Sequence, residues 1–199
     1  MISAGLIACT FIIFSQLKYI REKKLGFNKE NSIAIFLRND EIKRNAKSLK
    51  EEFSQLAPVE SASLASSIPG MSLNGSSYFP EGYDDDAWLV YEFDVDEDFI
   101  RNTFKMKLLS GRNFSAEFPT DSSAVIINET LKNNLKWKNA IGKTFKSNND
   151  MNEREELHVI GVVKDFHFRS LHEKIEPTMI HLSRSTPNLM ILRLNPGNI

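Results

Sequence analysis

The first fourteen residues of the chain, MISAGLIACTFIIF, contain no charged side chain and are mostly apolar. As an α-helix they would span about 21 Å, which is shorter than the roughly 30 Å hydrocarbon core of a bilayer. Good helix formers continue to Lys24 without proline or glycine, and Gly26 is a natural stop for such a helix. The sequence therefore predicts one long helix whose apolar first half continues into a polar, basic second half.

Four interpretations of this helix compete. A secretory signal needs basic residues ahead of the apolar run, and none are present. Leu6-Ile7-Ala8-Cys9 resembles a lipoprotein box, but the apolar run continues to Phe14, so processing at Cys9 would leave a hydrophobic stub. We favour the end of a transmembrane helix that begins before Met1, and a helix buried in the protein's own interior is the remaining alternative. The positive-inside tendency would place the basic flank in the cytoplasm, although large domains translocate largely regardless of charge. This flank comprises Lys18, Arg21, Lys23 and Lys24.

Composition places the rest of the chain among folded, globular proteins. The 199 residues are 41% hydrophobic and 26% charged, which is enough apolar material to bury a core. Lys and Arg number 25 against 26 Asp and Glu, for a net charge of −1. This balance argues against a dedicated nucleic-acid binder, which needs a basic surface. A single cysteine excludes a disulfide framework and a cysteine-based zinc cluster.

Hydrophobic patterning predicts a mixture of strands and short helices. Apolar residues between Asp40 and Leu56 recur at spacings of three and four, which defines one face of a helix. This helix lies between two predicted strands, 31–37 and 59–68, so the three elements form a β-α-β unit that favours a parallel strand pair. The segment 71–82 is rich in Ser, Gly and Asn and predicts a loop. Further strands are predicted over 87–95, 123–127, 157–163, 178–182 and 189–194, and further helices over 97–104 and 128–137.

The order of these elements predicts an α+β (α/β) fold. A β-α-β unit comes first, a mixed segment follows, and strands return at the end of the chain. The last strands can complete the sheet that the first unit begins. We therefore expect a discontinuous domain with an insertion.

Two short motifs resemble ligand loops without meeting their requirements. Gly142-Lys143-Thr144 has the end of a phosphate-binding loop, but the glycine needed five positions earlier is Trp137, and no helix is predicted to follow. The alternating acids of Asp94-x-Asp96-x-Asp98 resemble the start of a calcium loop. A calcium loop would need Gly at Phe99 and Glu at Lys105, so we interpret the acids as helix-capping residues.

No arrangement of side chains in the sequence supports catalysis. His167 and His172 are five residues apart, whereas a helix would place two metal ligands four apart. No cysteine and no pair of acids is arranged with them apart from Asp165, two positions before His167, and His158 and His181 have no ligand pattern. We predict no catalytic, cofactor-binding or metal-binding residues and no cofactor. Four aromatic residues are candidate contact points, with packing roles favoured, namely Tyr78, Phe79, Tyr83 and Trp88.

A set of ordered strings carries a family resemblance over nearly the whole chain. The set resembles the MacB-like periplasmic core domain of FtsX-type ABC transporter permeases, and most of all the second such domain of the long Bacteroidetes permeases. In chain order the strings are Leu25-Gly26-Phe27-Asn28-Lys29-Glu30, Ile68-Pro69-Gly70, Val95-Asp96-x-x-Phe99-Ile100, Gly111-Arg112-Asn113-Phe114, Ile126-Ile127-Asn128-Glu129, Ile141-Gly142-Lys143 and the run from Val159 to His172.

The resemblance implies a fold of two lobes on a stalk. Residues 1–27 would be the end of a transmembrane helix and a stalk. Residues 28–75 plus 155–199 would form a porter-like α/β lobe, and residues 76–154 an inserted Sabre-like lobe of mixed α/β structure. A further membrane helix would follow Ile199. The stalk would be a stiff lever, with Gly26 as the joint to the head.

The resemblance also implies a function and partners. The chain would be the periplasmic domain of an inner-membrane permease subunit that is not an enzyme. A separate cytoplasmic ATPase would supply the energy, which agrees with the failed phosphate loop. The domain would couple this energy to the export of peptides, toxins or lipoproteins, or to the control of a periplasmic partner. Its partners would be a periplasmic adaptor or outer-membrane protein and a second copy of the permease, with no nucleic acid.

Two other classes of function remain open. An extracytoplasmic sensor module would bind a small ligand and would need a concave pocket with converging polar groups. A hydrolase with an unrecognised site would need a cluster of histidine, acid and serine or metal ligands, with Asp165 and His167 as the starting point.

Overall fold

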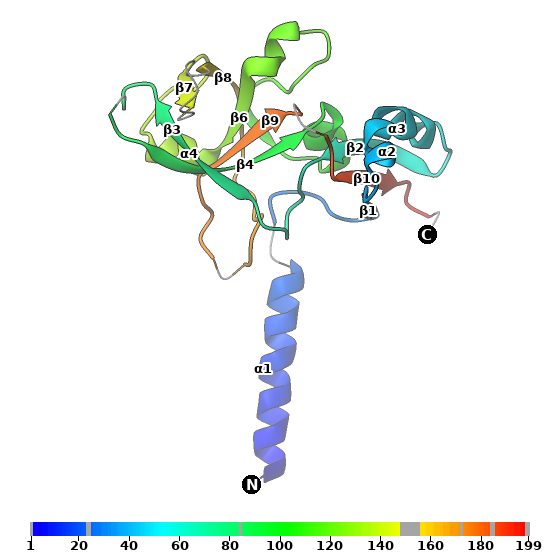
Figure 1. Ribbon diagram of the computed structural model, residues 1–199. Coiled ribbons are helices and arrows are strands. Elements are labelled where there is room, and N and C mark those ends of the chain that lie inside the picture. The colour runs from blue at the N-terminus through cyan, green and yellow to red at the C-terminus, as the bar shows by residue number, and fades with distance from the viewer. Residues whose placement is uncertain are drawn as a thin grey trace.

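The chain folds into a long N-terminal helix and a head of mixed α/β structure (Figure 1). The computed structural model describes residues 2–22, 25–83, 85–147, 156–171, 173–183 and 186–197. His172 lies outside these residues, as do the polar segment 148–155 and the side chains of the basic flank. The predicted fold class, a combination of α and β structure, is confirmed.

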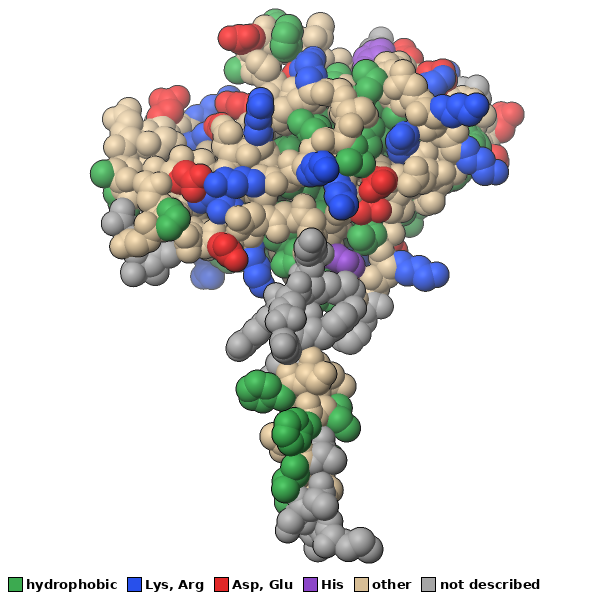
Figure 2. Space-filling view, turned by 180° about the vertical axis from the view of Figure 1, so that it is seen from behind, with side chains coloured by type: hydrophobic (Ala, Val, Ile, Leu, Met, Phe, Trp, Pro, Cys, Tyr) green, Lys and Arg blue, Asp and Glu red, His purple; other side chains and the backbone are tan. Residues whose placement is uncertain are grey.

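Helix α1 (Ile2–Glu22) projects away from the head as a stalk (Figure 1). Its large apolar side chains are exposed, including Phe11 at 72% and Phe14 at 71% (Figure 2). The alternative of a helix buried in the protein's own interior is therefore wrong. Cys9 is also exposed, in the middle of the helix. Within the described residues, no helix has both the length and the hydropathy that a membrane span requires.

The head contains ten strands joined by short helices. The strands are β1 (Ser32–Phe36), β2 (Val59–Ala65), β3 (Asn74–Pro80), β4 (Trp88–Val95), β5 (Leu108–Gly111), β6 (Ala124–Asn128), β7 (Thr144–Ser147), β8 (Glu156–Val163), β9 (Thr178–Leu182) and β10 (Leu189–Leu194). The helical elements are α2 (Asp40–Arg44), α3 (Ala46–Ser54), the π-helix η1 (Phe99–Thr103), the 3-10 helix η2 (Pro119–Ser123) and α4 (Glu129–Asn134).

Six of the strands close into a ring. The sheet order runs from β4 through β3, β7, β8 and β6 to β9, and β9 pairs in turn with β4. Each of the six contributes to one hydrophobic cluster, as closure of a sheet requires of its inward-facing positions. The cluster includes Tyr78, Val90, Val125, Ile127, Phe145, Leu157, Val159 and Met179. We call these six strands the closed ring.

Three of the remaining strands form an open edge beside the ring, and the fourth, β5, pairs with β8. β10 lies between β1 and β2 and is antiparallel to both. The predicted parallel pair is therefore wrong, because the last strand of the chain inserts between the two strands of the β-α-β unit. Helix α3 packs on β2 and covers a small cluster of six buried residues. We call β1, β10, β2, α2 and α3 the open edge.

A third hydrophobic cluster joins the ring to the open edge. It contains Phe99 and Ile100 of η1, the aromatic residues Phe166 and Phe168, and inward residues of β10. Phe93 lies within ring-contact distance of both Phe99 and Phe166, at 5.7 and 6.3 Å between centroids. The two parts of the head therefore share one continuous core.

Three local predictions need adjustment. The segment 71–82, predicted as a loop, contains strand β3, which pairs with both β4 and β7. The predicted helix 40–56 is divided into α2 and α3 at Asn45. Strands β8 and β9, expected in the lobe 28–75 plus 155–199, pair with strands of the segment 76–154. The division into two lobes stays a proposal.

Candidate functional site

The segment that joins the stalk to the head, Leu25–Asn31, is fixed to the head along its length. We call it the connecting segment. The backbone N–H of His167 donates to the carbonyl of Leu25 at 2.8 Å, and the N–H of Asn28 donates to the carbonyl of Phe104 at 2.8 Å. The ring of Phe27 packs edge-on against that of Phe104, 5.4 Å between centroids.

Gly26 lies where the connecting segment comes closest to the head. Its φ of +88° is in the left-handed region that favours glycine. A Cβ at this position would lie 2.4 Å from the carbonyl oxygen of Asp165 and 2.6 Å from Cα of Phe166. The glycine therefore permits a bend pressed against the head. Gly26 is therefore a bend fitted against the head backbone, at the position where the sequence predicts the joint between stalk and head.

Arg193 holds the far end of the connecting segment. Its side chain lies in β10, points away from α3, and is 3% exposed. The guanidinium donates to three backbone carbonyls, those of Asn28 at 2.5 Å, Glu30 at 3.0 Å and Thr103 at 2.5 Å. One buried side chain thus joins the connecting segment, the last strand and the π-helix η1.

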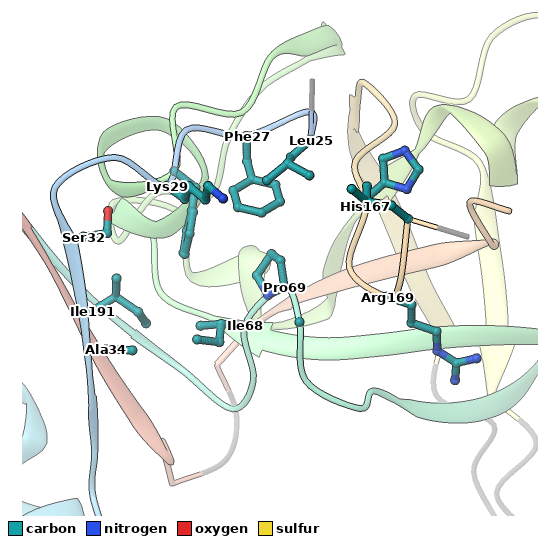
Figure 3. A pocket seen from close by; sticks show the side chains of 13 residues that line it. Leu25, Phe27, Lys29, Ser32, Ala34, Ile68, Pro69, His167, Arg169 and Ile191 are labelled. Atoms are coloured by element: carbon teal, nitrogen blue, oxygen red, sulfur yellow. The ribbon is translucent and has the colours of Figure 1, made fainter. Parts of the chain in front are cut away.

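An apolar cavity of about 320 Å³ lies beside the connecting segment (Figure 3). The side chains of Leu25, Phe27, Ile68 and Pro69 meet around it, as the figure shows. Arg169 turns away from it, because its guanidinium stacks over Tyr91 at 4.2 Å and pairs with Glu176 at 3.1 Å. The described lining is mostly apolar, with Lys29, Ser32 and His167 as its other polar residues.

Two acids of the motif that resembles a calcium loop, Asp96 and Asp98, bond to other parts of the chain. Asp96 accepts hydrogen bonds from the N–H groups of Leu64 and Asp98, and Lys50 lies 2.7 Å from Asp96 and 2.6 Å from Asp98. Burial raises the pKa of Asp96 to about 6, although the ammonium of Lys50 opposes the shift. Burial opposes the charge of Lys50, but the two carboxylates outweigh it and raise the pKa of Lys50. Lys50 and the two carboxylates thus attach α3 to the loop after β4.

The other candidate residues also have structural partners. Asp165 accepts from the N–H and the hydroxyl of Thr130, both at 2.8 Å, and so caps α4 without contacting a histidine in a catalytic arrangement. Nε2 of His181 lies 3.1 Å from the carboxylate of Glu92. His158 is exposed on β8, and His167 lines the cavity wall. Within the described part of the chain, no three His, Cys, Asp or Glu side chains are grouped to hold a metal ion.

A half-buried polar network surrounds Glu92 in the ring. Ser76 donates to its carboxylate at 2.5 Å, and Tyr78 and His181 contact the other oxygen. Burial works against ionisation of Glu92, but these hydrogen bonds prevail and lower its pKa. The serine bonds to the acid and not to the histidine, so the three groups do not form a nucleophile–base pair.

The phosphate-loop fragment and the aromatic residues behave as packing elements. Lys143 pairs with Glu81 at 2.5 Å, and Thr144 begins strand β7 in place of a helix. Tyr78 is 5% exposed and packs in the ring, and Tyr83 contacts Trp88 at 5.3 Å between centroids. Of the candidate contact points, these three serve packing.

Sequence reasoning missed Arg193. The signal that could have found it is a single cation in the otherwise apolar strand Leu189–Leu194. A charge at such a position must be paired or fully hydrogen-bonded when the strand is buried.

Three solved structures share the fold of this chain. The periplasmic region of MacB from Actinobacillus actinomycetemcomitans superposes with a TM-score of 0.59, at 15% identity over 89% of this chain and 80% of that one. The extracellular domain of the noncanonic ABC-type transporter YknZ from Gram-positive bacteria gives 0.57, at 13% identity over 84% and 86%. A domain assigned to a permease of Porphyromonas gingivalis gives 0.54, at 19% identity over 73% and 65%. The chain therefore shares its fold with these three domains.

The sequence identifies the family. Residues 2–198 match the model of the MacB-like periplasmic core domain. The chain belongs to this family, the periplasmic domains of MacB/FtsX-like ABC transporter permeases, as the ordered strings of the sequence predicted. No protein of curated function gives a significant match.

Proposed function

We propose that this domain couples ATP-driven movement of membrane helices to work in the periplasm and performs no catalysis itself. The observation that supports this proposal is the connecting segment, Leu25–Asn31. It is bonded to the head through Leu25, Asn28 and Glu30, and Gly26 fits against the head backbone. A displacement of the stalk would reach the head without being absorbed in this segment.

The proposal extends to the rest of the transporter. Residues 1–27 would be the end of a transmembrane helix of the cell inner membrane and a stalk. A separate cytoplasmic ATPase would drive two copies of the permease. An adaptor or outer-membrane protein would receive the movement, and peptides, toxins or lipoproteins would be the exported class. The domain would be the second of its kind in a long permease, with the porter-like and Sabre-like lobes in the boundaries given above.

The experiment measures movement of the head above the bilayer, so it needs no known substrate. The full permease with its ATPase is placed in lipid nanodiscs, with a donor fluorophore at Glu117→Cys and an acceptor on lipid headgroups. Glu117 is exposed on the head. The proposal predicts that ATP with vanadate changes the transfer efficiency. An unchanged efficiency in a complex that hydrolyses ATP would contradict it.

A flexible insertion tests whether the stalk transmits the movement. Eight Gly and Ser residues between Glu22 and Leu25 should abolish the nucleotide-dependent change while leaving the head folded. The matched control places the same insertion at Gly82, in an exposed turn where an added Cβ would meet nothing within 4 Å. The control should keep the change, and loss of the change in both variants alike would count against the stalk as transmitter.

A further inference from the structure

Arg193 is buried without a carboxylate partner. Among the described residues, no Asp or Glu oxygen lies within 4.0 Å of its guanidinium, whereas the half-exposed Arg112 pairs with Asp121 at 2.6 Å. A buried cation of this kind is stable only when its N–H groups are satisfied. Backbone carbonyls satisfy it here, and they belong to two other parts of the chain.

The three carbonyls lie where three parts of the chain meet, and Arg193 adds to two backbone bonds there, from Asn28 N–H to Phe104 and from Leu194 N–H to Asn31. Asn28 and Glu30 belong to the connecting segment, and Thr103 ends the π-helix η1. η1 carries Phe99 and Ile100 into the core between the ring and the open edge. Arg193 itself lies on β10, the central strand of the open edge. The guanidinium therefore bonds at the point where the connecting segment, the closed ring and the open edge meet.

We propose that Arg193 is the residue through which movement of the stalk is delivered to both parts of the head. Its planar fork bonds the connecting segment with two nitrogens and η1 with the third, so a displacement of Asn28–Glu30 moves β10 and η1 together. Lysine could not do this, because one ammonium cannot span three separate carbonyls in the geometry of a planar fork. This inference rests on the proposed coupling function.

The role is one of positioning, and its test separates coupling from stability. In the nanodisc assay above, Arg193→Met should lose at least four-fifths of the nucleotide-dependent change in transfer efficiency. Arg112→Met is the matched control, since it removes another bonded arginine that lies away from the connecting segment. It should lower the thermal midpoint of the head and keep the change.

A reversible covalent bond provides the rescue. Ser32 and Arg193 are opposite each other on β1 and β10. The hydrogen-bonded positions of β1 are the odd-numbered ones, because Asn31 bonds to Leu194 and Leu37 bonds to Asn188. Ser32 and Arg193 therefore form a non-hydrogen-bonded pair. Such pairs bring the Cα atoms to about 4.5 Å, within the range that a disulfide bridges. The variant Ser32→Cys with Arg193→Cys carries Cys9→Ser and is oxidised before the donor is attached at Glu117→Cys. The disulfide then protects both cysteines from the donor and replaces the guanidinium with a removable link.

The oxidised double variant should recover most of the nucleotide-dependent change, and dithiothreitol should remove it in the same sample. If Arg193→Met denatures the head, Arg193→Lys takes its place and should lose more than half of the change. Full change in a folded Arg193→Met or Arg193→Lys protein, or no difference between the oxidised and reduced double variant, would overturn the role of Arg193. An absent change in the wild-type complex would instead refute the coupling function.

Discussion

The closed ring and the open edge bury their cores in different ways. In the ring, closure of the sheet gives every strand a hydrogen-bonded neighbour on both sides, and each of the six strands contributes to one large cluster. The open edge covers six buried residues with one short helix and leaves Ile33 48% and Phe36 54% exposed on β1. It is attached to the ring by Ala65, Leu189 and Ile191 in the shared cluster, and by the polar contacts of Arg193 and the Lys50–Asp96 pair. The part joined to the stalk therefore has a smaller core of its own and depends more on polar contacts than the ring does.

The largest expected effect tests the core of the ring. Phe145 is fully buried among Tyr78, Trp137 and Leu157. Phe145→Ala should lower the free energy of unfolding by about 4 kcal/mol, because it removes a large side chain from a site that cannot collapse. Urea unfolding followed by circular dichroism measures this, with the exposed Phe118→Ala as the control. Equal effects of the two changes would show that the ring core does not dominate stability.

The next effect concerns the polar attachment of the open edge. The pKa of Asp96 is about 6 in the fold, above its ordinary 3.8. Between about pH 4 and 6 the folded protein therefore binds a proton that the unfolded chain releases, and the contribution of Asp96 to stability falls as pH rises. Relative to Asp96→Asn, the wild type should lose up to about 3 kcal/mol of unfolding free energy across this window.

The control for this pH effect is Asp121, whose interaction has the opposite sign. Burial works against its ionisation, but the guanidinium of Arg112 and the N–H of Ser115 prevail and lower its pKa. Its stabilisation is present above pH 4 and is lost as pH falls further. Urea unfolding at several pH values should give opposite slopes for Asp96→Asn and Asp121→Asn, each compared with wild type. Equal slopes would contradict the two assignments.

A pair of glycines tests how closely the connecting segment fits the head. Gly26 and Gly82 have nearly the same φ, +88° and +85°, but only Gly26 faces backbone atoms within 3 Å of an added Cβ. Gly82→Ala should cost about 1 kcal/mol for its conformation alone, and Gly26→Ala about 2 kcal/mol more. Thermal unfolding gives the difference. Equal costs would mean that the connecting segment can move away from the head.

The smallest effect is expected on the exposed side of the open edge. Phe36→Ser should change the free energy of unfolding by less than about 0.5 kcal/mol, because its ring is already half in water. Leu64→Ser, on the covered face of β2, should cost several times more, since it places a hydroxyl in the small core. Similar costs would indicate that Phe36 is buried in solution.

The sequence predicted the strands themselves better than it predicted which strands lie side by side. Seven strands were found from local patterning, because Ile, Val and aromatic residues mark them directly. β3 was missed because its Ser, Gly and Asn residues are stabilised by bonds to Glu92 and by pairing on both edges. The position of β10 between β1 and β2 depends on contacts across more than 120 residues, which no local pattern reports.

The prediction of no catalytic site came from motif spacing. Of the residues considered there, Asp165 bonds to Thr130 and His181 to Glu92. The connecting segment was found only in part. Gly26 was recognised as the end of a helix, but its close fit to Asp165 and Phe166 is visible only in three dimensions. The bonds of Arg193 to Asn28 and Glu30 likewise join residues more than 160 positions apart.

The central claim is that the connecting segment belongs to the rigid head, and amide hydrogen exchange of the full chain in nanodiscs tests it most directly. The N–H of Asn28, bonded to Phe104, should exchange only when the head unfolds, with the same free energy as buried amides of β10. Exchange of Asn28 at the rate of an exposed turn, while β10 stays protected, would show a free hinge and contradict the claim.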